Sequence, residues 1–128
     1  MVLLDTCTLL WLAADQEKLS KKALKSIKDN AGNLFISSIS AFEIAIKVRR
    51  GKIILPMSSN LWFKKALAHH GIYEISINSD IATSSVDLPL LHNDPCDRLI
   101  IATALANSMN IITCDIHIKQ YKEIKVIW

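Results

Sequence analysis

Four acidic residues stand where a folded chain could bring them together: Asp5, Glu43, Asp97 and Asp115. Asp5 and Asp115 each follow a short apolar run, which suits a buried strand of a parallel sheet. Glu43 and Asp97 each lie near the start of an expected helix. Carboxylates held a few ångströms apart repel one another, and some must take up protons unless a cation intervenes. Because oxygen ligands suit Mg²⁺ or Mn²⁺, which keep waters for a substrate phosphate, this set predicts a metal site.

Some of these acids also have a purely structural interpretation. Ser40 and Glu43 match the capping box S-x-x-E, which explains the glutamate without any chemistry. Asp94 and Asp97 suit the N-cap and the first turn of the next helix, where the helix dipole favours a negative charge. Asp5 and Asp115 are harder to explain in this way, because an aspartate that ends a buried strand needs a partner for its carboxylate. The sequence leaves open whether Asp94 is a helix cap or a metal ligand.

The elements that must position the acids follow from the apolar pattern. Strands are expected over residues 1–4, 34–37, 72–77 and 111–114, with a short last strand over 125–128. Helices are expected over residues 8–14, 20–29, 40–50, 59–70, 79–88 and 96–109, the last apolar on nearly every side and therefore buried. Strands that alternate with helices predict an α/β fold, a compact three-layer sandwich in which helices flank a mostly parallel central sheet. In such a sheet the carboxyl ends of the strands form the ligand-binding edge, where we expect all the acids.

Composition sets the broad class of the protein. At 128 residues the chain has room for a single domain, residues 1–128, and its 51% hydrophobic and 21% charged residues are typical of a well-buried globular protein. A formal charge of +3 permits contact with a polyanion without the dense basic face of a dedicated nucleic-acid binder. No apolar run approaches the ~20 residues that span a bilayer, and Asp5 interrupts the one segment that resembles a secretory signal. We therefore expect a cytoplasmic protein without a membrane partner.

Other chemistries lack their motifs. No glycine-rich phosphate loop and no H-E-x-x-H sequence is present, which excludes those nucleotide-binding and zinc-protease sites. Cys7, Cys96 and Cys114 form no C-x-x-C pair, which indicates a reducing compartment and disfavours structural zinc. The cysteines could be small hydrophobic residues or redox groups. His92, in the loop next to the acids, could touch substrate or have no chemical role.

Taken together, these segments resemble a PIN domain, specifically the VapC-like toxins of bacterial toxin–antitoxin pairs. The resemblance lies in LDTCTLLW (4–11), ISSISAFEIAIK (36–47), HNDPCDRLIIATAL (92–105) and IITCD (111–115), and so runs from end to end. The third segment is the most specific, because it combines a D-P-x-D-R turn with the apolar helix.

The resemblance implies a Mg²⁺-dependent endoribonuclease, in which Mn²⁺ can substitute, together with a homodimer and a cognate antitoxin that blocks the site. It implies Asp5 and Asp97 as the chief metal ligands. Glu43 and Asp115 would complete the pocket by bridging metals or orienting water. Arg98 would either reach the substrate phosphate or form an ion pair with the acids. Hydrolysis would leave a 5′-phosphate and a 3′-hydroxyl.

Three other functions stay open on the sequence alone. A nuclease of the same architecture that cuts structured DNA would carry the same acids. A phosphoacceptor signalling domain also clusters aspartates on a parallel sheet, but it needs two adjacent acids after the first strand and a lysine that closes the last one, and this chain has neither. The intact acids disfavour a catalytically silent module that only binds a partner.

Overall fold

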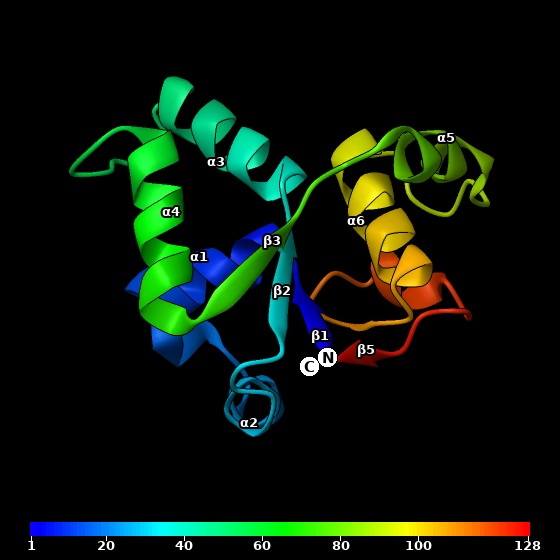
Figure 1. Ribbon diagram of the computed structural model, residues 1–128, viewed down its shortest axis with the longest axis horizontal. Coiled ribbons are helices and arrows are strands. Elements are labelled where there is room, and N and C mark those ends of the chain that lie inside the picture. Colours follow the sequence, from blue (N-terminus) through cyan, green and yellow to red (C-terminus); the bar gives the residue numbers. More distant parts are fainter.

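A five-stranded parallel sheet forms the centre of the computed structural model, which describes residues 1–128 (Figure 1). Its strands are β1 (Val2–Leu4), β2 (Leu34–Ser37), β3 (Ile72–Ile75), β4 (Asn110–Ile112) and β5 (Val126–Ile127). They lie in the order β3-β2-β1-β4-β5, and every neighbouring pair is parallel. The expectation of a mostly parallel sheet is confirmed. The register aligns Leu4 of the central strand with Ile36 and Ile112, so three strands end at one edge.

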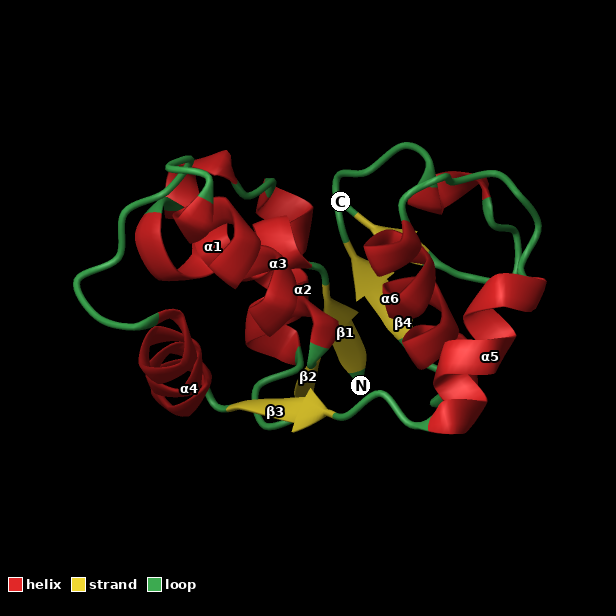
Figure 2. Ribbon diagram, turned by 90° about the horizontal axis from the view of Figure 1, so that it is seen from above, coloured by secondary structure: helices red, strands yellow, loops and turns green.

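Helices cover both faces of the sheet, as Figure 2 shows. The helices are α1 (Thr6–Ala14), α2 (Lys21–Asp29), α3 (Ile39–Arg49), α4 (Ser59–His70), α5 (Ser79–Asp87) and α6 (Pro95–Ala106). Helices α1 to α4 lie on one side, whereas α6 lies on the other with α5 packed against it. The three-layer sandwich expected from the sequence is therefore confirmed. None of these helices has the length and apolar character that a membrane span requires.

The central strand β1 contributes to two hydrophobic cores because successive side chains point to opposite faces of a sheet. Val2 and Leu4 belong to the larger core, under α1 to α4. Leu3 belongs to the smaller core, where it packs with Ile100 and Ile101 of α6. The apolar run that preceded Asp5 in the sequence is thus a strand buried on both faces.

Capping residues set several helix starts and ends. Ser20, Ser58 and Asn78 each accept a hydrogen bond from the first turn of α2, α4 and α5 respectively. Asp94 does the same for α6, so its expected cap role is confirmed. Helix α4 ends at Gly71, whose φ of 63° is the left-handed conformation common after a helix.

Other boundaries differ from expectation. Helix α1 begins at Thr6 and not at residue 8, because Asp5 is its N-cap. Strand β4 ends at Ile112 and β3 at Ile75, each two residues early, and α6 ends at Ala106, three residues early. Two short 3₁₀ helices, Gln16–Lys18 and Ile118–Gln120, were not expected. Such short elements carry little periodic signal, since one turn cannot display an apolar face.

We expect Leu3→Ala to lower the free energy of unfolding by about 2–5 kcal/mol, because Leu3 is 0% exposed and truncation leaves a cavity. Leu90→Ala is the matched control, since Leu90 is 83% exposed, and should change stability by less than about 0.5 kcal/mol. Urea unfolding followed by circular dichroism measures both variants. Equal small losses would contradict the assignment of Leu3 to the core.

Candidate active site

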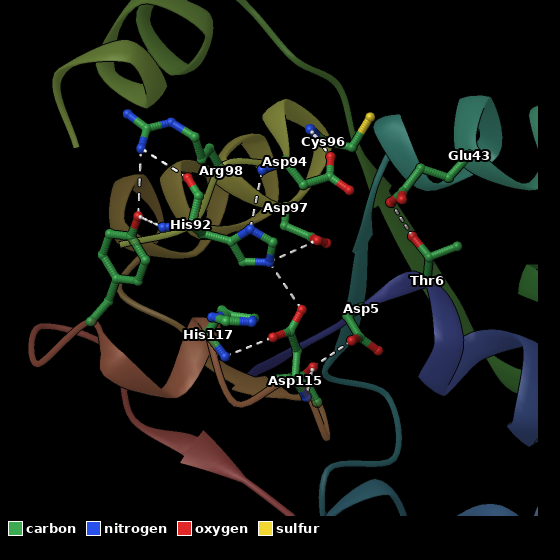
Figure 3. Close-up of polar contacts among 12 residues, drawn as sticks. Asp5, Thr6, Glu43, His92, Asp94, Cys96, Asp97, Arg98, Asp115 and His117 are labelled. Carbon is green, nitrogen blue, oxygen red and sulfur yellow. Dashed lines mark hydrogen bonds and ion pairs between the residues drawn. The ribbon is translucent and has the colours of Figure 1, made fainter. Parts of the chain in front are cut away.

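The carboxyl edge of the sheet gathers the acids that the sequence singled out (Figure 3). Asp5 follows β1 and Asp115 lies three residues after β4, while Glu43 projects from α3, which follows β2. Asp94 and Asp97 come from the start of α6 on the other side of the sheet. We call these five residues the acidic pocket.

Asp97 is shared by two groups of side chains that could each hold a metal ion. The ligand atoms of Glu43, Asp94 and Asp97 all lie within 4.8 Å of one another. Those of His92, Asp97 and Asp115 do so as well. Two ligands of one Mg²⁺ lie at most about 4.2 Å apart, twice the ~2.1 Å ligand distance, so a small closing movement would fit either group to the ion.

Asp5 is the most buried acid and belongs to neither group. It is 6% exposed, and one carboxylate oxygen accepts a hydrogen bond from the Thr8 N–H at 2.8 Å. Its other oxygen accepts from the hydroxyl of Thr113, which is fully buried. Asp5 therefore has the capping role that the sequence argument had assigned only to other acids. Each carboxylate oxygen can accept two hydrogen bonds, so a lone pair on each remains for a cation.

Glu43 is held by a residue of α1 and not by a capping box. Helix α3 follows Ser38, whose side chain makes no capping hydrogen bond. Ser40 lies inside the helix, where its hydroxyl is 2.9 Å from that of Thr6. The Thr6 hydroxyl donates to Glu43 Oε1 at 2.6 Å. The capping box expected at Ser40 and Glu43 is wrong, because the helix starts one residue earlier and its first turn faces α1.

His92 lies between two of the acids. Its Nδ1 accepts the backbone N–H of Asp94 at 3.1 Å, which leaves the ring proton on Nε2. That Nε2 is 3.0 Å from a carboxylate oxygen of Asp97 and 3.0 Å from one of Asp115. The backbone N–H of His117 donates to the other oxygen of Asp115 at 2.7 Å. The histidine whose role the sequence left open thus ties Asp97 and Asp115 together.

Burial, repulsion and hydrogen bonds shift the pKa values of the acids in different directions. Burial, with the charges of Glu43 and Asp94, raises the pKa of Asp97 to about 7. Burial also raises the pKa of Glu43. Burial pushes the pKa of Asp115 up too, but hydrogen bonds from His92 and from the backbone outweigh it and lower this pKa. Close carboxylates that raise one another's pKa are stabilised by a cation, and the oxygen-rich donors of the pocket fit Mg²⁺ or Mn²⁺.

Burial raises the pKa of the three thiols beside the acids, Cys7, Cys96 and Cys114. All three are free. Burial, reinforced by Asp5, raises the pKa of Cys7 to about 11, and burial with Glu43 does the same for Cys96. Since the thiolate is the reactive form, these values favour the interpretation of small side chains over redox groups.

Arg98 points away from the acidic pocket (Figure 3). It forms none of the ion pairs in the structure and is 8% exposed. Its guanidinium donates to five backbone carbonyls between 2.8 and 3.3 Å away: Ser85, Val86, Leu88, Pro89 and His92. Several of these end α5, where carbonyls lack helical partners and attract a cation. The alternative of an ion pair with the acids is therefore wrong, and both Nη atoms of the guanidinium already donate to carbonyls, which disfavours the alternative of a contact with the substrate phosphate.

Tyr121 holds the same loop and was missed by the sequence argument. Its hydroxyl donates to the Pro89 carbonyl at 2.6 Å and accepts the His92 N–H at 3.1 Å. The side chain is 1% exposed. We call Arg98 and Tyr121 the loop clamp, because both fix the segment that carries His92. No spacing in the sequence signals this contact, since Pro89 and Tyr121 are 32 residues apart.

Comparison with known proteins places the chain in a family. The sequence profile of the PIN domain matches residues 2–124. The chain belongs to the PIN domain family. A relative of this PIN domain, ribonuclease VapC22 of Mycobacterium tuberculosis, is 32% identical over 122 residues, which cover 94% of the chain and 92% of the relative.

Solved structures share the fold of this PIN domain. A toxin–antitoxin complex from Klebsiella pneumoniae contains a chain with 21% identity and a TM-score of 0.68, covering 97% of this chain and 95% of that one. A chain of VapBC2 from Rickettsia felis, bound to a DNA fragment from its promoter, has 17% identity and a TM-score of 0.71. The match covers 98% of this chain and 97% of that one. The α/β architecture expected from the sequence is thus the architecture of these proteins.

We expect Asp97→Asn to leave the metal-free protein at least as stable as the parent. Because the folded pKa of Asp97 is about 7 against a usual 3.8, the folded state binds the proton more tightly, and stability falls as pH rises from about 4 to about 7. Asparagine removes the charge, so the variant should melt no lower at neutral pH and lose stability less steeply over this range. Thermal melts in chelator measure both. If the substitution instead lowers the free energy of unfolding by about 2 kcal/mol, the main role of Asp97 is structural.

Removal of the Tyr121 hydroxyl tests the loop clamp. Tyr121→Phe leaves a carbonyl and an N–H without their partner, so the free energy of unfolding should fall by about 1–3 kcal/mol. Tyr73→Phe removes a hydroxyl from a side chain on β3 that is 57% exposed, and should stay within about 0.5 kcal/mol of the parent. Urea unfolding compares the two, and equal losses would show that the hydroxyl does not hold the loop.

Proposed function

We propose that this PIN domain is a Mg²⁺-dependent endoribonuclease and the toxin of a toxin–antitoxin pair, with Mn²⁺ able to substitute. The observation that carries the proposal is the acidic pocket, in which Asp97 belongs to two possible ligand groups and has a pKa of about 7 without a cation. RNA as the substrate is supported by the relative with 32% identity, which is named a ribonuclease.

Each acid has a distinct part in the proposed site. Asp97, which belongs to both ligand groups, is one of the two chief metal ligands in this proposal. Asp5 is the other: its oxygens lie outside both groups, but Thr8 and Thr113 hold its carboxylate rigid at the same edge of the sheet. Glu43 and Asp115 complete the pocket on either side of Asp97 (Figure 3). The lowered pKa of Asp115 keeps it ionised at neutral pH, so it adds charge that attracts a cation.

The proposed reaction is hydrolysis of a phosphodiester bond. Mg²⁺ held in the pocket would lower the pKa of a water molecule and offset the negative charge of the scissile phosphate. Glu43 and Asp115 can each orient an attacking water and accept its proton. Attack at phosphorus breaks the bond to the 3′-oxygen, which takes up a proton, and so leaves a 5′-phosphate and a 3′-hydroxyl.

We also propose a homodimer, a cognate antitoxin that blocks the pocket, and a cytoplasmic location. Solved neighbours that share the fold include a toxin–antitoxin complex, which supports the antitoxin. Exposed apolar side chains near the α5–α6 loop support a protein interface: Val86, Leu90, Leu91 and Ile116. The free cysteines fit a reducing compartment.

The purified protein should cleave RNA in Mg²⁺ or Mn²⁺ and stop in excess chelator. Asp97→Asn should lower the cleavage rate at least about a hundredfold, as expected for a lost metal ligand. Mg²⁺ should raise the melting temperature of the parent, because it binds the folded site, and that of the variant much less. Gel-based cleavage and thermal melts give these readouts.

Asp80→Asn is the matched control, because Asp80 also lies in the first turn of a helix, α5, but is exposed and away from the pocket. It should cleave like the parent. Structured DNA tested side by side should be cut far more slowly than RNA. Full activity in chelator would overturn the metal mechanism, and preferred cleavage of DNA would overturn the assignment of RNA as substrate.

A further inference from the structure

His92 is held at both of its ring nitrogens and at both of its backbone polar groups. Its backbone N–H donates to the Tyr121 hydroxyl at 3.1 Å, and its carbonyl accepts from Arg98 Nη1 at 3.3 Å. On the ring, Nδ1 accepts the Asp94 N–H at 3.1 Å, and Nε2 is hydrogen-bonded to Asp115 at 3.0 Å. Only 11% of the side chain is exposed. These contacts fix the place of the ring and the direction in which each nitrogen points.

The contact at Nδ1 limits what His92 can do beside a metal ion. A ring nitrogen binds a metal through a lone pair, so that nitrogen must carry no proton. Because Nδ1 uses its lone pair on the Asp94 N–H, the proton of the neutral ring lies on Nε2. Nε2 therefore has no lone pair for a metal, although it lies within the group formed with Asp97 and Asp115. To bind one, the ring would have to move its proton to Nδ1 and lose its contact with the start of α6.

The proton on Nε2 instead faces two carboxylates. Nε2 is 3.0 Å from Oδ2 of Asp115, to which it donates, and 3.0 Å from Oδ2 of Asp97 (Figure 3). These acids come from separate elements, Asp97 from α6 and Asp115 from the segment after β4. Two carboxylates side by side repel each other, and a shared N–H donor between them offsets that repulsion. His92 thus holds the two acids together before any cation binds.

A cation has another group of ligands on the other side of Asp97 (Figure 3). There the ligand atoms of Glu43, Asp94 and Asp97 all lie within 4.8 Å of one another. All three are carboxylates, which suit Mg²⁺ or Mn²⁺, whereas an imidazole ligand would suit zinc, copper or nickel. A hydrogen bond to a carboxylate that binds metal fixes the orientation of that carboxylate, and its loss weakens metal binding.

We propose that His92 is a positioning residue and not a metal ligand: its Nε2–H holds Asp97 and Asp115 in place for a cation whose protein ligands are carboxylates. This inference rests on the metal-dependent function proposed above. It assigns the group that contains His92 to hydrogen bonding and leaves the metal to the other side of Asp97. The loop clamp then influences metal affinity through the ring that it holds.

Two substitutions separate the roles of the two ring nitrogens. His92→Asn places an amide oxygen near the position of Nδ1, so it can accept the Asp94 N–H but has no donor that reaches the acids. His92→Gln places an amide N–H near the position of Nε2, so it can donate to the acids but loses the acceptor for Asp94. In calorimetric titration of the whole protein with MnCl₂, the Asn variant should bind about 10–100-fold more weakly, and the Gln variant within about threefold of the parent.

His117→Asn is the matched control, because it changes the neighbouring histidine. The two rings pack with their centroids 5.3 Å apart, but the His117 side chain makes none of the hydrogen bonds in the structure. The backbone N–H of His117, which donates to Asp115, is kept in the variant. This variant should bind Mn²⁺ as the parent does. Melting curves in chelator establish that all three variants are folded.

Spectroscopy reports the ligands of the metal directly. Electron spin echo spectra detect a nitrogen that is bonded to Mn²⁺, and we expect none in the complex of the parent. In ¹⁵N NMR spectra, Nδ1 of His92 should carry no proton either in the metal-free protein or in the Mg²⁺ complex. A role confined to the packing of the loop would predict neither the absence of nitrogen ligands nor rescue by glutamine.

Several results would overturn the proposal. Equal losses in both His92 variants, with a nitrogen bonded to Mn²⁺, would make His92 a ligand. Weak binding by the Gln variant with normal binding by the Asn variant would mean that the ring acts through Nδ1 on the loop alone. Normal binding by both would mean that the ring does not position the acids. If the parent binds neither Mn²⁺ nor Mg²⁺, the metal-dependent function fails as well, a distinct result because then no variant binds.

Discussion

Repulsion among buried carboxylates is the constraint on which the rest of this structure depends. Five acids share one edge of the sheet, and the pKa of Asp97 rises to about 7 because burial and its neighbours disfavour its charge. Left free, such side chains would turn away into solvent. Instead Asp5 is fixed by Thr113, and Glu43 by Thr6, each through a hydroxyl donor. These hydrogen bonds favour the ionised form and hold the oxygens where a cation can be shared.

The two hydrophobic cores supply the rigidity that this arrangement requires. Asp5 and Glu43 come from the side of the sheet covered by α1 to α4, whereas Asp97 comes from α6 on the opposite side. The acidic pocket therefore straddles the edge of the sheet, and its geometry depends on how both layers pack on β1. On the α6 side, the loop clamp adds a second support by holding the segment that carries His92. Arg98 is buried and donates to backbone carbonyls, so it supports the site although its side chain points away from the acidic pocket.

Local patterns predicted the strands, the helices and the positions of the acids, because an apolar run followed by an aspartate or a proline after an N-cap is visible within a few residues. Contacts between distant segments left no such trace. Glu43 meets Thr6 across 37 residues, and this contact replaced the expected capping box. Arg98 sits beside an acid in the sequence, yet its side chain turns toward the end of α5. Residue type alone could not reveal these partners, since each depends on which faces the folded layers present.

The pairing of β1 with β4 has a consequence for how the protein is made. Asp5 follows β1, and the Thr113 hydroxyl that binds it lies 108 residues later in the chain. During translation, β1 must therefore wait until β4 (Asn110–Ile112) has been made before one of its two neighbours exists. A nascent chain on the ribosome lacks both Asp115 and the hydroxyl that positions Asp5, so its pocket is incomplete. Translation that stops before Asn110 would leave the central strand as a bare apolar edge, a product suited to aggregation and degradation and not to catalysis.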